Sequence, residues 1–216
     1  MNSPLLYLIR KPKVTIDNPP LLILLHGVGS NENDLFSLSD FLPDSFMIVS
    51  VRGPITLGRD RYGWYEISFL GGIPKIDSEQ QKSSHQIILK FIDYLKTNYQ
   101  FNTKQIWIGG FSQGAVMSYS VGLEHPDLIK GIIALSSRLL DETKNNIVMD
   151  QESKGQRIYI AHGTNDTVIP VTSARASKDF LDKVGFVPIY KEYTEGHTIS
   201  REMLKDLVGW LEKELE

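Results

Sequence analysis

One serine of the sequence stands where its hydroxyl could act as a nucleophile. Ser112 is the centre of a Gly-Phe-Ser-Gln-Gly pentapeptide at 110–114, which follows the apolar, β-favouring run 106–108 and precedes a stretch at 115–123 with helical apolar spacing. A tight strand-to-helix turn lifts a serine hydroxyl clear of the backbone and directs the free N–H groups of the helix at developing negative charge. Because strand and helix approach closely there, glycine is needed two residues before and after the serine. The pattern predicts nucleophilic catalysis by Ser112.

A serine nucleophile needs a base and a group that orients the base. Of the five histidines, two follow Ser112 by a full strand or more, His162 and His197. Asp166 lies four residues after His162 in a loop behind a predicted strand, and His197 comes later in a glycine-hinged loop before the last helix. In the chain order serine, acid, histidine of α/β-hydrolases, Asp166 is the orienting carboxylate and His197 the base. We expect His26 and His162 to shape loops through hydrogen bonds and His85 to lie at the surface. Asp141, five residues past Ser136 in a polar stretch, is the competing candidate for the acid.

Acyl transfer also creates an oxyanion, which needs fixed N–H donors. The backbone N–H of Gln113, directly after the nucleophile, is the first predicted donor. The second is the N–H of Val28, which lies between Gly27 and Gly29 in the loop after the apolar run 21–25. Glycine on both sides allows that backbone to turn its N–H inward. The two loops together predict an oxyanion hole.

The elements that must position these residues alternate between strands and helices. Predicted strands lie at 5–10, 14–16, 21–25, 46–51, 106–108, 131–136, 157–161 and 189–193, and predicted helices at 34–43, 84–99, 115–125, 172–184 and 203–211. Such alternation predicts one α/β domain over 1–216, with a mostly parallel central sheet and helices on both faces. Ligands collect at the carboxyl ends of such strands, where the predicted site residues lie.

Residues 52–77 have no clear periodicity and are rich in glycine and aromatic side chains. A segment of this kind inside a compact domain is often a functional loop. It is too short to build a separate cap domain, so we expect an open cleft walled by apolar side chains of this loop. The candidates for this substrate pocket are Trp64, Phe69, Leu70 and Ile73.

Composition excludes several other classes of protein. Lys and Arg number 23 against 26 Asp and Glu, a net charge of −3 without segregation, so we expect no nucleic-acid partner. There is no cysteine for a disulfide, a thiolate zinc site or a cysteine nucleophile, and the scattered histidines predict no metal site. The apolar run 5–9 is too short for a signal segment or a membrane span. The expectation is therefore a cytoplasmic protein without stable membrane insertion.

Together these segments resemble the small serine carboxylesterase, phospholipase and acyl-protein thioesterase-like family of α/β-hydrolases. The segments that carry the resemblance are 25–29, 51–54, Trp64, 110–114, 162–170 and 196–197. The resemblance implies an α/β-hydrolase fold without a cap domain and hydrolysis of esters or thioesters without a cofactor. It also implies Ser112, Asp166 and His197 as the triad, N–H donors at Val28 and Gln113, and Trp64 near the acyl site.

Two departures leave the substrate open: Ser136-Ser137 stands where the family commonly has Ser-Gly, and residues 58–77 do not match beyond Trp64. We predict a serine hydrolase that cleaves small-molecule esters or thioesters of short to medium acyl chains through an acyl-enzyme. The alternatives are an acyl-protein thioesterase or lysophospholipase acting on long acyl chains, peptide-bond hydrolysis by the same triad, and a hydrolase-fold binding protein. A homodimer is left open.

Overall fold

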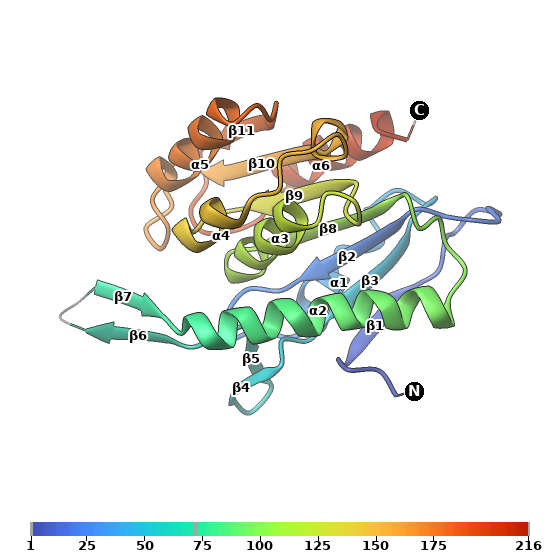
Figure 1. Ribbon diagram of the computed structural model, residues 1–216, viewed down its shortest axis with the longest axis horizontal. Coiled ribbons are helices and arrows are strands. Elements are labelled where there is room, and N and C mark those ends of the chain that lie inside the picture. The colour runs from blue at the N-terminus through green and yellow to red at the C-terminus, as the bar shows by residue number, and fades with distance from the viewer. Residues whose placement is uncertain (1, 71–72, 216) are drawn as a thin grey trace.

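The apolar runs of the sequence form a seven-stranded sheet (Figure 1). The computed structural model describes residues 2–70 and 73–215, without the side chains of Phe69, Leu70, Ile73 and Pro74. Across the sheet the order is β1 (Tyr7–Arg10), β3 (Met47–Val51), β2 (Leu21–Leu25), β8 (Ile106–Phe111), β9 (Gly131–Leu135), β10 (Arg157–Gly163) and β11 (Ile189–Tyr193). Edge strand β1 runs antiparallel to β3, and all the other neighbours are parallel. The prediction of a mostly parallel sheet is confirmed.

Alternating side chains of the strands enter two different cores, which explains why the central strands are apolar throughout. Ile23 of β2 belongs to the core that packs against α2, α3 and α5, whereas Leu22 and Leu24 belong to the core under α1 and α6. Figure 1 shows α2 and α3 in front of the sheet and α6 behind it. The helices are α1 (Asn33–Phe36), α2 (Ser78–Asn98), α3 (Gln113–Glu124), α4 (Asp141–Asn146), α5 (Val171–Lys183) and α6 (Arg201–Lys213), with a short 3₁₀ turn at Ser153–Gly155.

The segment 52–77 is not irregular, as the sequence suggested, but forms two β-hairpins. Strand β4 (Ile55–Gly58) pairs with β5 (Arg61–Gly63), and β6 (Ile67–Leu70) pairs with β7 (Ile73–Ile76), both antiparallel. Each strand has three or four residues, too few for the alternation of side chains to stand out in the sequence. The β6–β7 hairpin extends beyond the sheet on the side to which the arrows of β2 and β10 point (Figure 1). The described part of the chain contains no cap domain.

Two N-terminal predictions are wrong. Residues 14–16 form no strand, and Val14 and Ile16 are exposed, because β1 already provides the edge of the sheet. The helix predicted at 34–43 ends at Phe36 and continues as turns with i→i+3 hydrogen bonds, such as Phe41 N–H to the Leu38 carbonyl at 3.0 Å. A short helix therefore covers little of this face of the sheet. None of the helices in the described residues is long and apolar enough to cross a bilayer.

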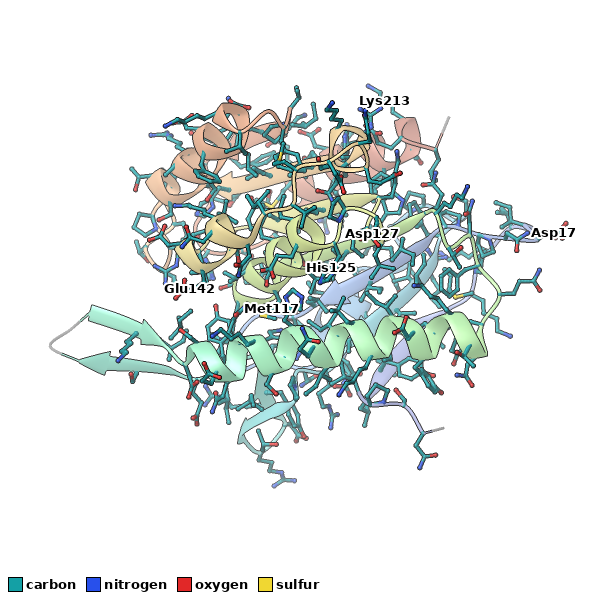
Figure 2. All side chains as sticks on the ribbon, in the orientation of Figure 1. Asp17, Met117, His125, Asp127, Glu142 and Lys213 are labelled. Carbon is teal, nitrogen blue, oxygen red and sulfur yellow. The ribbon has the colours of Figure 1, made fainter. Side chains whose placement is uncertain are left out.

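A buried polar cluster joins α2 to α3, and the sequence did not predict it. His85 of α2, expected at the surface, is only 5% exposed. Its Nδ1 lies 2.7 Å from Ser120 Oγ, and its Nε2 lies 3.1 Å from Nε2 of His125, the residue that ends α3. His125 lies between the two helices in Figure 2. Burial, and secondly the neighbouring His125, lower the pKa of His85 to about 4.

The lowered pKa of His85 makes protein stability depend on pH. In the unfolded chain His85 is protonated below its ordinary pKa of 6.5, whereas in the folded protein it is protonated only below about pH 4. The free energy of unfolding therefore decreases as the pH falls from 6.5 to about 4. The loss between pH 7 and pH 5 is about 2 kcal/mol from this group. Urea unfolding at both pH values should show it in the wild type and not in His85→Gln. Equal pH dependence of the two proteins would contradict this assignment.

Candidate active site

Ser112 occupies a strained turn between β8 and α3, as the pentapeptide predicts. Its φ of 53° and ψ of −116° are unusual for a residue with a side chain. A Cβ atom on Gly110 would lie 2.4 Å from the carbonyl carbon of Gly114, and one on Gly114 would lie 1.9 Å from the Leu25 carbonyl oxygen. Neither position accepts any other residue. The two glycines therefore allow α3 to begin directly against β8 and β2, with Ser112 at the apex.

A chain of hydrogen bonds connects Ser112 to Asp166 through His197. His197 Nε2 lies 3.0 Å from Ser112 Oγ, and His197 Nδ1 lies 2.7 Å from Asp166 Oδ2. The carboxylate can only accept, so Nδ1 carries the proton and Nε2 is free to accept the hydroxyl proton. The residues come from loops after β8, β10 and β11, whose parallel strands end at the same edge of the sheet. The structure thus brings together the three residues that the sequence selected.

Asp166 is held from several directions. Its Oδ1 accepts the backbone N–H groups of Val168 at 2.8 Å and Ile169 at 2.9 Å. Burial alone would raise the pKa of Asp166, but the hydrogen bonds from His197 and from these two N–H groups outweigh it and lower the pKa. His162 Nε2 donates to the Ile169 carbonyl at 2.8 Å and lies 3.2 Å from Asp166 Oδ2. His162 therefore shapes the loop of Asp166, as expected.

The loop after β2 is fixed around Val28. Gly29 N–H donates to the Tyr62 carbonyl at 2.7 Å. His26 donates from Nδ1 to the Gly27 carbonyl at 2.7 Å and accepts the Gly53 N–H on Nε2 at 2.9 Å. Burial lowers the pKa of His26, which keeps the ring neutral, as these two bonds require. The backbone N–H of Val28 has no acceptor among the described residues.

The backbone N–H of Gln113 likewise has no acceptor within the described chain. The side chain of Gln113 has a structural role instead: its Oε1 accepts the Trp64 N–H at 2.8 Å and its Nε2 donates to the Tyr65 carbonyl at 2.7 Å. These bonds fix the start of α3 to the segment after β5. Two N–H groups without an acceptor thus belong to segments next to Ser112: Gln113 follows it in the chain, and a Cβ on Gly27, beside Val28, would lie 3.6 Å from Ser112 Cβ.

The pocket predicted around Trp64 needs a correction. Trp64 is 0% exposed, and its indole N–H donates to the His26 carbonyl at 2.9 Å. Trp64 therefore holds the loop after β2 through the His26 carbonyl and does not line an open cleft. Its bulk and aromatic character suggested a pocket wall because the sequence does not reveal burial. The other predicted pocket residues, Phe69, Leu70 and Ile73, belong to β6 and β7, and their side chains lie outside the described part of the structure.

Two polar contacts that support the site were not predicted from the sequence. Arg52 forms a two-pronged pair with buried Glu32, at 2.6 Å from Nε to Oε2 and 2.5 Å from Nη2 to Oε1. These hydrogen bonds outweigh burial and lower the pKa of Glu32. Ser137 Oγ donates to the Ser112 carbonyl at 3.0 Å, so the second serine of Ser136-Ser137 braces the turn that holds Ser112. Residues this far apart in sequence give no spacing signal.

The site residues do not form a metal centre. Among the described residues, no three or more His, Asp or Glu side chains are grouped so that they could hold a metal ion. The arrangement instead has a hydroxyl, a base, a charged carboxylate and two free N–H groups. These are the parts that acyl transfer requires.

Comparison with known proteins agrees with this geometry. The phospholipase/carboxylesterase family matches residues 13–215. Acyl-protein thioesterase 1 of Gibberella zeae is 31% identical over 173 residues, 74% of this chain and 72% of its own, and that of Kluyveromyces lactis is 26% identical over 91% and 92%. The Bacillus cereus carboxylesterase structure superimposes with a TM-score of 0.83 at 23% identity, covering 98% of this chain and 95% of that one. The chain belongs to the phospholipase/carboxylesterase family of α/β-hydrolases, which are carboxylic ester hydrolases.

Proposed function

We propose that the protein hydrolyses carboxylic esters or thioesters of short to medium acyl chains, with Ser112 as nucleophile, His197 as base and Asp166 as orienting acid. One observation carries this proposal: the unbroken hydrogen-bond path from Ser112 Oγ through His197 to Asp166. At its Ser112 end, this path lies next to the loops of two backbone N–H groups, those of Val28 and Gln113, which have no acceptor among the described residues. A binding protein with this fold would have no need for all these groups in working geometry.

In the first half of the reaction, Ser112 Oγ attacks the carbonyl carbon while its proton passes to His197 Nε2. The carbonyl oxygen becomes an oxyanion, and the N–H groups of Val28 and Gln113 stabilise it. Asp166 stays ionised and stabilises the imidazolium of His197, because its lowered pKa keeps it charged. The start of α3 adds the positive end of the helix dipole.

In the second half, His197 gives its proton to the alcohol or thiol, which leaves, and the acyl group remains bonded to Ser112. A water molecule then takes the place of the leaving group. His197 accepts its proton, a second oxyanion forms in the same N–H pair, and the acid is released as the proton returns to Ser112 Oγ. No cofactor takes part in these steps.

The length of the acyl chain follows from the lack of a cap in the described residues. The site is open on the side of His197 and Phe111, where a cavity of about 220 Å³ faces solvent. An open site covers a short or medium chain and leaves the end of a long one in water, so further methylenes gain nothing. The second candidate is a long-chain thioesterase. The relatives' name, acyl-protein thioesterase 1, favours the thioesterase part of this candidate and says nothing of chain length.

A series of p-nitrophenyl esters from acetate to palmitate tests both candidates. We expect kcat/KM to rise by up to roughly fourfold per methylene over the first few carbons, and then to level off or fall. Parallel assays with thioesters of the same acyl groups measure the ester-to-thioester preference. A steady rise to palmitate would favour the long-chain candidate. If none of the esters or thioesters is hydrolysed, the proposed function is wrong.

A further inference from the structure

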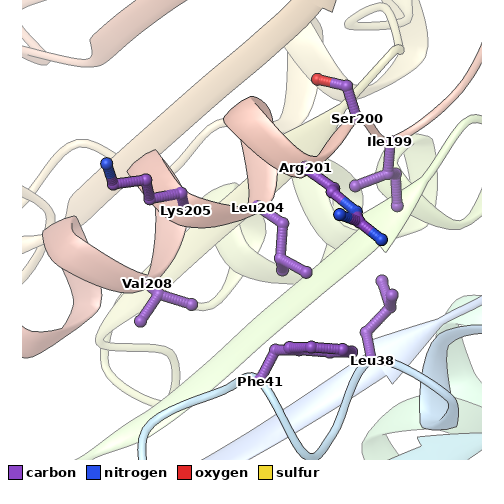
Figure 3. Close-up of a pocket in the computed structure, with 8 residues that line it drawn as sticks. All are labelled: Leu38, Phe41, Ile199, Ser200, Arg201, Leu204, Lys205 and Val208. Carbon is purple, nitrogen blue, oxygen red and sulfur yellow. The ribbon is translucent and has the colours of Figure 1, made fainter.

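An apolar groove lies behind the sheet, between α6 and the turns that follow α1. It has a volume of about 630 Å³, and we call it the α6 groove (Figure 3). The apolar side chains that line it are Leu38, Phe41, Ile199, Leu204 and Val208. Phe41 is 65% exposed, although it is a large aromatic residue. The groove exists because α1 has only four residues and leaves part of the core under α1 and α6 uncovered.

The α6 groove continues into the candidate active site. Leu38 and Ile199 line both this groove and the 220 Å³ cavity that contains Phe111 and His197. The Phe111 ring lies against His197, with ring centroids 4.7 Å apart. A continuous surface therefore runs from His197 past Ile199 to Phe41 and Val208. Its end at His197 also carries the polar side chains of Asp34, Ser37 and Thr198, and it becomes mainly apolar from Leu38 and Ile199 onward. Its helical part, from Arg201 to Val208, is about 10 Å long at 1.5 Å per residue.

The chemistry of the proposed reaction decides which half of the substrate faces this surface. In the tetrahedral intermediate, the oxyanion points to the N–H groups of Val28 and Gln113 and one oxygen is bonded to Ser112. The leaving oxygen or sulfur must lie within hydrogen-bond reach of His197 Nε2, which protonates it. The alcohol or thiol therefore departs on the side of His197. That is the side on which the α6 groove begins.

The side chains at the rim restrict the charge of the occupant. Arg201 reaches over the groove towards Leu38, whereas Lys205 points away from Phe41 (Figure 3). Arg201 forms no ion pair within the described chain, so it places an uncompensated positive charge beside the apolar surface. A cationic group would be repelled there. Ser200 and Lys205 also line the groove, and the other five lining side chains are apolar, which suits a hydrocarbon chain.

We propose that the α6 groove binds the leaving-group half of the substrate, and that this half is an alcohol or thiol with an uncharged apolar chain of roughly octyl length. The inference rests on the proposed function and names a substrate class for it. It assigns the chain on the acyl side to a different part of the site. The protein then prefers esters whose longer chain is on the alcohol side.

Two isomeric esters test this directly, because octyl acetate and ethyl octanoate have the same atoms and differ in which side carries the long chain. We expect kcat/KM to be larger for octyl acetate, and to rise about twofold or more per methylene from methyl to octyl acetate. Phe41→Ser, at an exposed position that folding tolerates, should lower kcat/KM for octyl acetate roughly three- to tenfold relative to ethyl octanoate. The matched control is Val187→Ser, which changes an apolar side chain that is 89% exposed and lies outside the groove.

The possible outcomes separate this inference from the proposed function. If p-nitrophenyl acetate is hydrolysed but alkyl acetates show no rise with alcohol length, the groove does not bind the leaving group, and the hydrolase function stands. If Phe41→Ser and Val187→Ser give the same ratio between the isomers, the chain binds elsewhere and the inference is wrong. If Phe41→Ser changes the sedimentation of the protein and not that ratio, the groove is an interface between two copies. If p-nitrophenyl acetate is not hydrolysed at all, both proposals fail.

Discussion

Replacing Ser112 by alanine is expected to lower kcat for p-nitrophenyl acetate by on the order of 10⁶-fold, because no acyl-enzyme can then form. The protein should stay folded. Ser112 Oγ bonds only to His197 in the described structure, and alanine differs from serine by that one oxygen. The φ of 53° is as strained for alanine as for serine, so the substitution adds no new backbone cost. Steady-state kinetics and thermal unfolding of the same preparation measure both effects.

The control for this variant is Ser83→Ala, which removes an exposed hydroxyl on α2, away from the site. Its kcat and unfolding temperature should match those of the wild type. We expect some hydrolysis above the rate in water to remain in Ser112→Ala, because the proposed oxyanion donors, the N–H groups of Val28 and Gln113, would still polarise a carbonyl. Full activity of a well-folded Ser112→Ala protein would contradict the assignment of the nucleophile.

Asp166→Asn should lower kcat by roughly 10⁴-fold. An asparagine can present an N–H to His197 Nδ1, and the ring then carries its proton on Nε2, where it cannot accept the proton of Ser112. The imidazolium also loses its stabilising charge. The variant also tests the lowered pKa of Asp166. A lowered pKa means that the folded protein stabilises the charged carboxylate, and asparagine removes that charge. Its free energy of unfolding at pH 7 should therefore be about 1–3 kcal/mol lower than that of the wild type, which urea unfolding measures.

Asp141 is the matched control, since its position after β9 makes it the alternative acid by sequence. In the structure it begins α4, is exposed, and pairs with Lys144 at 2.8 Å. Asp141→Asn removes the same charge without touching His197, so its kcat should be close to that of the wild type. An inactive Asp141→Asn together with an active Asp166→Asn would reverse the assignment.

The meeting of Ser112, Asp166 and His197 was the feature of the site that the sequence predicted most directly. Ser112, Asp166 and His197 each follow a buried strand, and parallel strands end at one edge, so their chain order carries three-dimensional information. The two glycines around Ser112 also have a steric cause, because a Cβ atom at either position would clash with the neighbouring backbone. Local sequence therefore specified both the turn and the position of the residues that meet there.

Burial and long-range pairing were the parts that sequence did not reveal. Trp64 looked like a pocket wall and is fully buried under the Val28 loop, and His85 looked like a surface residue and is buried against α3. The pairing of Glu32 with Arg52 depends on loops that are adjacent only after folding. The two hairpins within 52–77 have strands too short to give a periodic signal. Each of these features depends on tertiary contacts.

The most direct test of the central claim is covalent labelling with a fluorophosphonate, followed by mass spectrometry of the proteolysed protein. The reagent phosphonylates a serine only where a base activates it and N–H groups stabilise the developing charge. We predict a single modified peptide, containing Ser112, and no label in Ser112→Ala. Label on a different serine, or none on a protein that hydrolyses p-nitrophenyl acetate, would contradict the claim that Ser112 is the nucleophile.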